Sequence, residues 1–311
     1  MIYTVTLNPS IDRTLHLRGL RVGELNRADS AAIDLAGKGV NVSVALRALG
    51  LESVLLGFAG GATGRYLVDG LRERGYTCAF QQVRGETRSN LTVVDDASGQ
   101  VTKLNEPGPM VSPTDLDALM ATIERIGDGD VCVLSGSLPP GAPSDTYARL
   151  ISTLRSQGAH VALDASGAAL AEGLMARPDL IKPNLAEARD LLDVSLNGPQ
   201  AWAEAVHALR ERGARHVVLS LGKQGAVSDE GGSTLWARPP VIEEASPVGA
   251  GDALLAGWLY ARERGLDETE RLRWAVACGT AAAGLDGSRM PCQEAVEEMR
   301  LQVEVQLIRA A

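Results

Sequence analysis

The fold is decided by a stretch that begins VCVLSGSLPPG at residues 131–141 and ends HVALD at residues 160–164. The first five residues form a short apolar, β-branched run, and polar and glycine residues follow it directly. A helical pattern over residues 143–157 is closed by Gly158, a common residue at helix C-termini. A strand, a helix and a second strand in this order predict two parallel strands joined by a crossover helix.

The same alternation continues on both sides of this unit. It predicts a mainly parallel sheet with helices on both faces, which is an α/β fold. Beyond Pro247, helices are expected over 252–264, 267–285 and about 292–307. The remaining predicted strands are 3–7, 53–58, 180–182 and 216–221, and the remaining predicted helices are 40–49, 64–74, 112–126, 185–192 and 200–212.

Two segments, 13–35 and 87–104, break the alternation because they contain short alternating strands with no helix between them. These strands either pair into one small sheet that projects from the main body or form two unrelated surface hairpins. A projecting sheet would serve as a lid over a site or as a dimer interface. No linker divides the chain, so residues 1–311 are expected to form a single domain.

The composition excludes several classes of protein. The 311 residues are 45% hydrophobic and 22% charged, and the formal net charge of −9 argues against a nucleic-acid binder. The four cysteines are scattered without a C-x-x-C pair, so free thiols in a reducing compartment are expected. The chain begins directly with a strand pattern, and no apolar run approaches the roughly 18 residues of a membrane span. These features predict a cytoplasmic protein without a membrane segment.

The segment Gly249-Ala250-Gly251-Asp252, just before a helical run, carries the most specific local signal for chemistry. Glycine amides at a helix N-terminus form an anion site. Asp252 is either an ordinary N-cap or a base that takes a proton from a substrate hydroxyl while the amides hold a transferring phosphoryl group. A dinucleotide fingerprint is disfavoured because Leu254 occupies the place of its third glycine, and no P-loop motif occurs.

Other polar segments follow predicted strands or open predicted helices. In AGKGVN at 36–41, Lys38 is either a solvated loop residue or a phosphate ligand, with Asn41 then meeting hydroxyls. Asn8 and Asp12 follow the first strand and are either turn formers or ligand groups. Glu187 is either a first-turn helix charge or a residue that holds hydrated Mg²⁺. Because open α/β sheets bind ligands at the carboxyl ends of their strands, these segments together predict one cleft.

In their order along the chain, these segments resemble the motifs of the ribokinase-like, PfkB-type carbohydrate kinases. The resemblance runs from TLNPSID at 6–12 to GAGD at 249–252 and includes TRSN at 87–90 and NEPGP at 105–109. It is nearest to the branch of bacterial 1-phosphofructokinases and tagatose-6-phosphate kinases. It implies a three-layer α/β/α fold with a small β lid, use of ATP and Mg²⁺, and a homodimer through the lid.

The resemblance also implies a role for each matching residue. Asp252 would be the base, and Gly249, Ala250 and Gly251 would form the anion hole. The expected substrate residues are Asp12 and Asn41 for sugar hydroxyls, Lys38, Arg88, Ser137 and Arg27 for the existing phosphate, and Gly37, Gly39 and Asn90 beside them. The expected ATP and metal residues are Lys182, Asn184, Ser220, Gly222 and Gly225, with Glu187 for Mg²⁺.

The chain departs from the family pattern in three places. Ala36 replaces a common glycine, Pro247 stands where a threonine is common, and 288–292 is atypical, which weakens any expectation of a monovalent cation. The expected reaction is phosphorylation of a primary hydroxyl of a ketohexose phosphate, with fructose 1-phosphate as the leading case. Tagatose 6-phosphate and fructose 6-phosphate remain open as substrates. Outside this class, the alternatives are a catalytically silent nucleotide or sugar-phosphate binding protein and a dehydrogenase.

Overall fold

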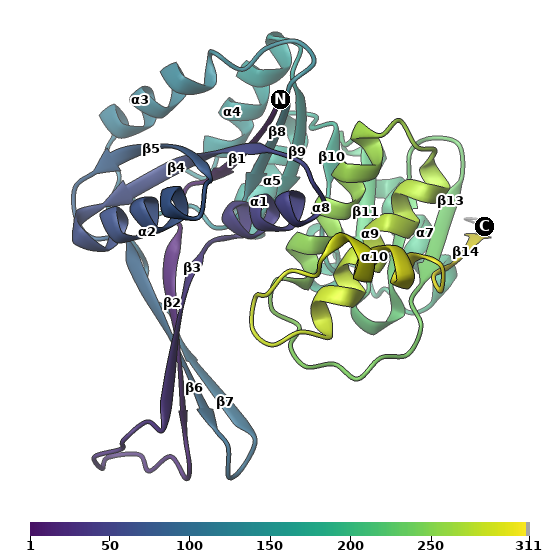
Figure 1. Ribbon diagram of the computed structural model, residues 1–311. Helices are drawn as coiled ribbons and strands as arrows, with labels where there is room; N and C mark the ends of the chain where they lie inside the picture. The colour runs from purple at the N-terminus through teal and green to yellow at the C-terminus, as the bar shows by residue number, and fades with distance from the viewer. Residues whose placement is uncertain (309–311) are drawn as a thin grey trace.

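The main body of the protein is a ten-stranded sheet, seen in a computed structural model that describes residues 1–308 (Figure 1). Its strand order is β14-β13-β12-β11-β10-β9-β8-β1-β4-β5. The strands from β11 to β5 run parallel, and β12, β13 and β14 are antiparallel to their neighbours, so the predicted α/β class is confirmed. The strands are β1 (Ile2–Thr6), β4 (Ser53–Gly60), β5 (Thr77–Val83), β8 (Val131–Ser135), β9 (His160–Asp164), β10 (Leu180–Ile181), β11 (His216–Ser220), β12 (Ala226–Asp229), β13 (Thr234–Arg238) and β14 (Glu304–Ile308).

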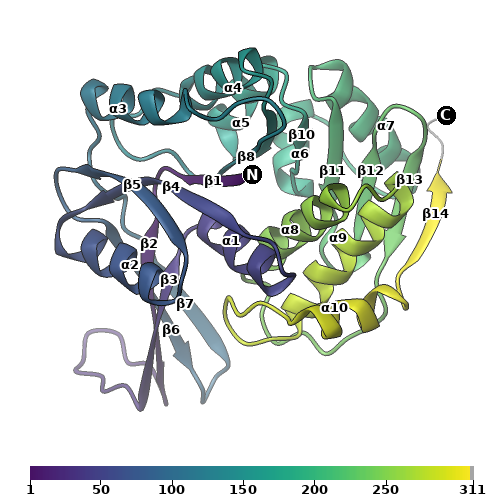
Figure 2. The same ribbon diagram turned by 45° about the horizontal axis from the view of Figure 1, so that its top comes forward.

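Helices cover both faces of this sheet because alternate strand residues point to opposite sides. In β8, Cys132 and Leu134 join one buried apolar cluster, whereas Val131 and Val133 join the other. Figure 2 shows the two helical layers. One layer contains α3 (Pro113–Ile123), α4 (Thr146–Ser156), α5 (Gly167–Met175), α6 (Leu185–Leu192) and α7 (Pro199–Glu211), and the other contains α1 (Lys38–Ala48), α2 (Gly61–Glu73), α8 (Ala250–Glu263), α9 (Glu268–Ala283) and α10 (Gln293–Arg300). Within residues 1–308, no helix combines the length and apolarity that a membrane crossing requires.

A second sheet of four strands projects from the body (Figure 1). It contains β2 (Ser10–Leu17), β3 (Ser30–Ala36), β6 (Arg88–Asp95) and β7 (Gln100–Leu104), in the order β3-β2-β6-β7. Of the two alternatives for segments 13–35 and 87–104, pairing into one sheet is therefore the one that forms. Asp12 lies inside β2 opposite Asn90 of β6, not in a turn.

The prediction of a helix over 292–307 is wrong in its second half. α10 ends at Arg300, and Glu304–Ile308 forms β14, which pairs antiparallel with β13. Without β14, the outer edge of β13 would have a row of backbone N–H and C=O groups with no hydrogen-bond partners. Pairing with β14 supplies these partners, and this gain outweighs the helical preference of the local sequence. The sequence patterns did not predict the hairpin of β12 and β13, and they did not predict β5 or α5.

The order of the strands places the ligand-binding crevice. From β1 the chain moves to β4 and β5 on one side, and later to β8, β9, β10 and β11 on the other. The carboxyl ends of the strands beside such a reversal form the usual binding crevice of open α/β sheets. The ends of β1, β8 and β9 therefore define where a site is expected.

Gly57 in β4 offers a test of how tightly this crevice edge is built. Its φ is +147°, and a Cβ atom there would lie 1.9 Å from the backbone oxygen of Thr6 in β1. We expect Gly57→Ala to lower the free energy of unfolding by at least about 1 kcal/mol, measured by urea denaturation. Gly265→Ala is the matched control because Gly265 also has a positive φ but has open space around it. Equal losses in the two variants would contradict the steric explanation.

Candidate active site

The N-terminus of α8 is an open anion site. Gly249 is its N-cap residue in the left-handed conformation (φ 78°), and no side chain caps the helix. Among residues 1–308, no acceptor is found for the backbone amides of Gly251 and Asp252. Unsatisfied amides at a helix start attract negative charge. The explanation of Asp252 as an ordinary N-cap is therefore wrong.

The Asp252 carboxyl is buried, with 6% of the residue exposed, and its Oδ2 accepts a hydrogen bond of 2.8 Å from Asn41 Nδ2 of α1. Burial raises the pKa of Asp252, and the nearby Asp164 carboxylate raises it further. The Asn41 hydrogen bond and the ammonium groups of Lys38 and Lys182 act in the opposite direction. A carboxyl group with a raised pKa that lines a cavity is suited to accept a proton.

Asp164, at the end of β9, binds two lysines. Its Oδ1 lies 3.0 Å from Lys38 Nζ, and its Oδ2 lies 3.3 Å from Lys182 Nζ. Asp164 and Lys182 are buried, whereas the Lys38 side chain is 38% exposed. Burial lowers the pKa of Lys38, but the carboxylates of Asp164 and Asp252 outweigh that effect and raise it overall. Both acidic groups therefore keep Lys38 charged where it faces the cavity.

Asp164 was not among the predicted site residues. Its signal in the sequence is a single carboxylate that ends an otherwise apolar strand, HVALD. A polar residue after a strand had likewise marked Asn8.

A cavity of about 730 Å³ opens beside this group of charges. Its volume suits a small organic ligand. Its lining combines polar and apolar residues, which suits a molecule with phosphate groups and a flat base. The polar lining includes Lys38, Asp164, Lys182, Asn184, Ser220, Gly222, Gly225 and Gly249–Asp252, and the apolar lining includes Pro239, Val241, Ile242, Leu254, Val276 and Ala283. The structure thus brings together the residues predicted for ATP, and it adds an apolar wall that the sequence had not indicated.

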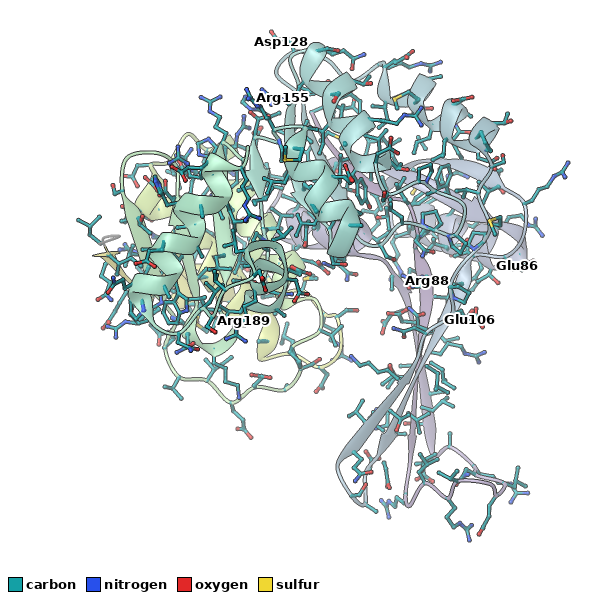
Figure 3. The ribbon with its side chains drawn as sticks, turned by 180° about the vertical axis from the view of Figure 1, so that it is seen from behind. Glu86, Arg88, Glu106, Asp128, Arg155 and Arg189 are labelled. Atoms are coloured by element: carbon teal, nitrogen blue, oxygen red, sulfur yellow. The ribbon has the colours of Figure 1, made fainter. Side chains whose placement is uncertain are left out.

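Arg88 lies where the small sheet joins the body, close to Glu106 (Figure 3). Its Nε and Nη2 donate to the backbone oxygen of Asn8 at 3.2 and 3.0 Å, and its Nη1 donates to that of Glu106 at 3.4 Å. Asn8 Nδ2 in turn donates to Ser137 Oγ at 3.3 Å. A guanidinium has five N–H groups, so two remain for a ligand.

Asp12 is held from two sides at the base of the small sheet. Its Oδ1 accepts hydrogen bonds from Ser10 Oγ at 2.7 Å and from Asn90 Nδ2 at 2.9 Å. Its Oδ2 accepts no hydrogen bond within residues 1–308 and stays available for a hydroxyl. Asp12 and Asn90 therefore form one fixed polar unit, and their contact with a substrate stays a prediction.

The glycines of the Gly37-Lys38-Gly39 segment are required by packing. A Cβ atom at Gly37 would lie 2.7 Å from Thr6 Cγ2, and one at Gly39 would lie 2.5 Å from Thr6 Oγ1. The lack of side chains at Gly37 and Gly39 therefore lets this segment pack against the end of β1. Their contact with a substrate stays a prediction.

Asn184 and Glu187, predicted for ATP and Mg²⁺, also have a structural role. Asn184 and Glu187 form a capping box at the start of α6, with the Glu187 carboxylate accepting from the Asn184 amide at 2.9 Å. Glu187 is thus a first-turn helix charge, and its metal role stays a prediction.

Arg27 lies in the loop between β2 and β3, at the far tip of the small sheet (Figure 1). That tip is about 20 Å from the base of β2, so a single chain does not bring Arg27 to the other residues.

Three comparisons relate this chain to known proteins. Residues 5–295 match the pfkB family carbohydrate kinase model. The 1-phosphofructokinase of Rhodobacter capsulatus is 39% identical over 309 residues, which are 99% of this chain and 98% of that protein. The 1-phosphofructokinase of Bacillus subtilis (strain 168) is 35% identical over 305 residues, or 98% and 99% of the two chains. The structure of phosphofructokinase-2 from Escherichia coli in complex with potassium has a TM-score of 0.92 at 31% identity, over 96% of this chain and 98% of that one.

The family match spans most of the sequence, and both relatives align over nearly their whole length. The crevice, the open helix N-terminus and the carboxylate beside it are the parts that a phosphoryl transfer site needs. The chain therefore belongs to the pfkB family of carbohydrate kinases, ATP-dependent phosphotransferases that work with a divalent metal ion.

Proposed function

We propose that this enzyme transfers the γ-phosphoryl group of ATP to a primary hydroxyl of a ketohexose phosphate, with fructose 1-phosphate as the substrate and fructose 1,6-bisphosphate as the product. The observation that carries the proposal is the buried Asp252 carboxyl beside two free helix amides and the Lys38 ammonium. The two relatives named 1-phosphofructokinase support the choice of sugar phosphate.

In this reaction Asp252 accepts the proton of the attacking hydroxyl as that oxygen forms a bond to the γ-phosphorus. The bond from the γ-phosphorus to the bridging oxygen of ATP breaks, and ADP leaves with that oxygen. The amides of Gly251 and Asp252 stabilise the charge on the transferred group. Asn41 holds the Asp252 carboxyl in position through its hydrogen bond. These groups provide positioning and electrostatic stabilisation, and little covalent chemistry is asked of the protein.

The residues present are compatible with Mg²⁺. Within residues 1–308, no three acidic, histidine or cysteine side chains are grouped as a metal site. Mg²⁺ in kinases is usually bound by one or two carboxylates together with substrate phosphates, so such a group is not needed. Glu187 is the side chain that we assign to hold it. When bound, the ion would neutralise charge on the β- and γ-phosphates.

The two ends of the substrate site are assigned different tasks. Asp12 and Asn41 meet sugar hydroxyls, with Asn90 and the backbone of Gly37 and Gly39 beside them. The phosphate already on the sugar is bound by Lys38, Arg88 and Ser137. These groups recognise the charge of the phosphate better than the stereochemistry of the sugar. For this site, the candidate substrates therefore differ mainly in the position of their phosphate.

A turnover panel with fructose 1-phosphate, fructose 6-phosphate and tagatose 6-phosphate tests this choice. We expect the highest kcat/KM for fructose 1-phosphate, measured as ADP release at saturating ATP. A higher value for either other sugar would overturn the proposed substrate but keep the kinase. No release of ADP with any of the three would favour a catalytically silent binding protein.

The small sheet is proposed to act as a lid and as the interface of a homodimer. Its strands and tip loop expose large apolar side chains, which is unusual for a surface with no partner. These are Leu20, Val22, Leu25, Ile33, Val101 and Leu104. In such a dimer, Arg27 at the tip of one chain is the residue that we expect to reach the other chain's substrate phosphate.

Sedimentation velocity tests this assembly. We expect a dimer of the 32.7 kDa chain and a shift toward monomer in Leu104→Asp, because a charge would then be buried at the interface. Leu301→Asp is the matched control, since Leu301 is equally apolar and 78% exposed but lies on the main body. A monomeric wild-type protein, or equal behaviour of the two variants, would contradict the interface.

A further inference from the structure

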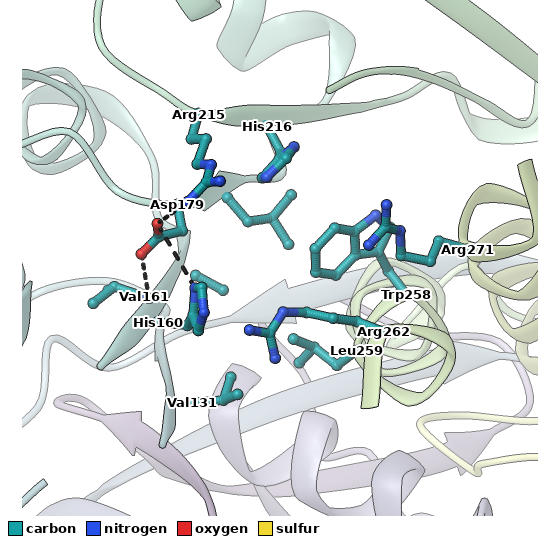
Figure 4. Close-up of a pocket in the computed structure, with 12 residues that line it drawn as sticks. Val131, His160, Val161, Asp179, Arg215, His216, Trp258, Leu259, Arg262 and Arg271 are labelled. Atoms are coloured by element: carbon teal, nitrogen blue, oxygen red, sulfur yellow. Dashed lines mark hydrogen bonds and ion pairs between the residues drawn. The ribbon is translucent and has the colours of Figure 1, made fainter. Parts of the chain in front are cut away.

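A second cavity, of about 310 Å³, lies at the amino-terminal ends of strands of the main sheet, opposite the ends that carry the active site (Figure 4). It is lined by the first residues of β8, β9, β10 and β11, namely Val131, His160, Leu180 and His216. The active-site residues lie at the other ends of the same strands. His160 and Asp164 are the two ends of β9, which places the two cavities about 13 Å apart along that strand.

The other wall comes from two helices. Trp258, Leu259 and Arg262 project from α8, and Arg271 projects from α9. In Figure 4, Trp258, Arg262 and Arg271 face the strand-edge residues across the cavity. The guanidinium of Arg271 lies over the Trp258 ring, 5.6 Å from its centroid. The Trp258 and His216 rings are 6.2 Å apart.

The lining is positively charged, in contrast to the net charge of −9 of the whole chain. It contains three guanidinium groups and one carboxylate, so its formal charge is +2 when both histidines are neutral. Asp179, the single carboxylate, is shared: its Oδ2 accepts from the Val161 amide at 3.0 Å, and its Oδ1 lies 4.0 Å from Arg215 and 3.8 Å from His160. Asp179 is the one carboxylate of the lining itself, and the ion-pair partners of Arg262 and Arg271, Glu263 and Glu230, lie outside the lining.

The three arginines retain free donors. Arg262 uses Nη1 for an ion pair with its neighbour Glu263, and Arg271 uses Nη2 for Glu230 behind the cavity. The Nε of Arg271 is buried without a hydrogen-bond partner among the described residues. The Arg215 side chain, 68% exposed, makes no hydrogen bond within residues 1–308 beyond its loose approach to Asp179. Buried donors without partners are costly, and an added acceptor would satisfy them.

The two histidines respond to the positive charge of this cavity. Burial lowers the pKa of His216 to about 4, and Arg215, Arg271 and Arg210 add to that effect against Asp179. His216 also faces Glu230, with 3.8 Å between Nδ1 and Oε2.

Burial likewise lowers the pKa of His160, with Arg262 and Arg215 acting in the same direction and Asp179 and Glu263 opposing them. Both imidazoles are therefore neutral at pH 7. A bound anion would raise both pKa values because it favours the charged imidazolium.

We propose that this cavity is a second ligand site, which binds a small organic anion through a group with at least two negative charges, a phosphate or a pair of carboxylates. Arginine forks suit both kinds of oxyanion, and Trp258 offers a flat apolar wall for the body of the molecule. The volume is at the lower end of small-molecule sites, which fits a compact metabolite. The proposal does not depend on the kinase reaction or on its substrate.

The four histidines of the chain provide a direct readout. His160 and His216 line the cavity, whereas His16 on β2 and His207 on α7 lie elsewhere and serve as internal controls. Inorganic phosphate and, separately, malonate are titrated into the full-length protein at constant ionic strength, and the imidazole resonances are followed by NMR. We expect saturable shifts of His160 and His216 with at least one of the two probes, together with higher pKa values for both. The probe that binds more tightly identifies the phosphate or the carboxylate source.

Two variants locate the binding. Arg262→Gln and Arg215→Gln are each expected to raise the apparent dissociation constant at least about tenfold, the effect of losing a charge-assisted hydrogen bond. Arg215 is largely exposed, so its variant is expected to fold even if that of Arg262 does not. Arg264→Gln, at the C-cap of the same helix but outside the lining, should titrate like the wild type. The proposal is overturned if His160 and His216 move no more than His16 and His207 with both probes, or if Arg215→Gln binds as tightly as the wild type.

Discussion

Asp252→Asn is expected to lower kcat by roughly 10²–10⁴-fold, the usual contribution of a general base. Asparagine has almost the same shape as aspartate, and its oxygen can still accept the hydrogen bond that Asn41 donates to Asp252. The variant loses only the ability to take up a proton from the sugar hydroxyl. The KM values for ATP and the sugar phosphate should therefore change much less than kcat, which steady-state assays of ADP release would measure.

Asp267→Asn is the matched control for this variant. Asp267 is also an aspartate at a helix start, on α9, where its Oδ1 accepts from the Glu270 amide at 2.9 Å. Asparagine caps helices as well as aspartate does, so its kcat should stay within a factor of about two of the wild type. Near-normal turnover in Asp252→Asn would remove Asp252 from the role of base. A similar loss in both variants would point to damage of the fold.

Asp164→Ala is expected to lower the free energy of unfolding by about 3–5 kcal/mol, the range found when one partner of a buried ion pair is removed. Asp164 is 1% exposed, and so its removal leaves the Lys182 ammonium, itself 5% exposed, without its counter-charge. Lys38 is more exposed and can turn toward solvent, so Lys182 carries most of the cost. Urea denaturation measures the effect.

A double variant separates this explanation from simple loss of packing. If the cost comes from an unpaired ammonium, replacing it by an apolar side chain in Asp164→Ala/Lys182→Met should recover most of the lost stability. Asp69→Ala is the surface control: Asp69 and Arg72 are both exposed and 3.8 Å apart, so the loss should stay below about 1 kcal/mol. A double variant no more stable than Asp164→Ala would contradict the electrostatic origin.

Much of the architecture follows from local patterns. Short apolar, β-branched runs such as VCVLS at 131–135 mark buried parallel strands, because such strands are covered on both faces. A polar segment after the first strand indicated Asp12, and glycine-rich segments that open helices indicated Lys38, Asn41 and Asp252. For Asp252 the local sequence allowed two explanations, an N-cap and a base. The structure shows that α8 has no side-chain cap and that the Asp252 carboxyl accepts a hydrogen bond from Asn41 instead.

The features that were missed depend on contacts between distant segments. β14 forms because β13 offers it an unpaired edge, and this edge is not visible in the residues 304–308 themselves. Asp164 gains importance only because α1 and β10 place one lysine on each side of it. The apolar wall of the large cavity combines Pro239 and Ile242 with residues of α8 and α9, which no local period connects. Local sequence preferences identify helices and strands, whereas tertiary contacts decide which residues come together in the site.

The hydrogen bond between Asn41 and Asp252 joins residues 211 positions apart. During synthesis, Asn41 has left the ribosome long before Asp252 is made. At about 5–20 residues per second, translation of the intervening chain takes on the order of 10–40 seconds. A nascent chain that ends after β11 already contains Asp12, Lys38, Arg88 and Ser137, but not the proposed base. Phosphoryl transfer is thus withheld until residue 252 has emerged, and two separately expressed parts of the chain, divided after β11, should be inactive alone and regain turnover only when they reassemble.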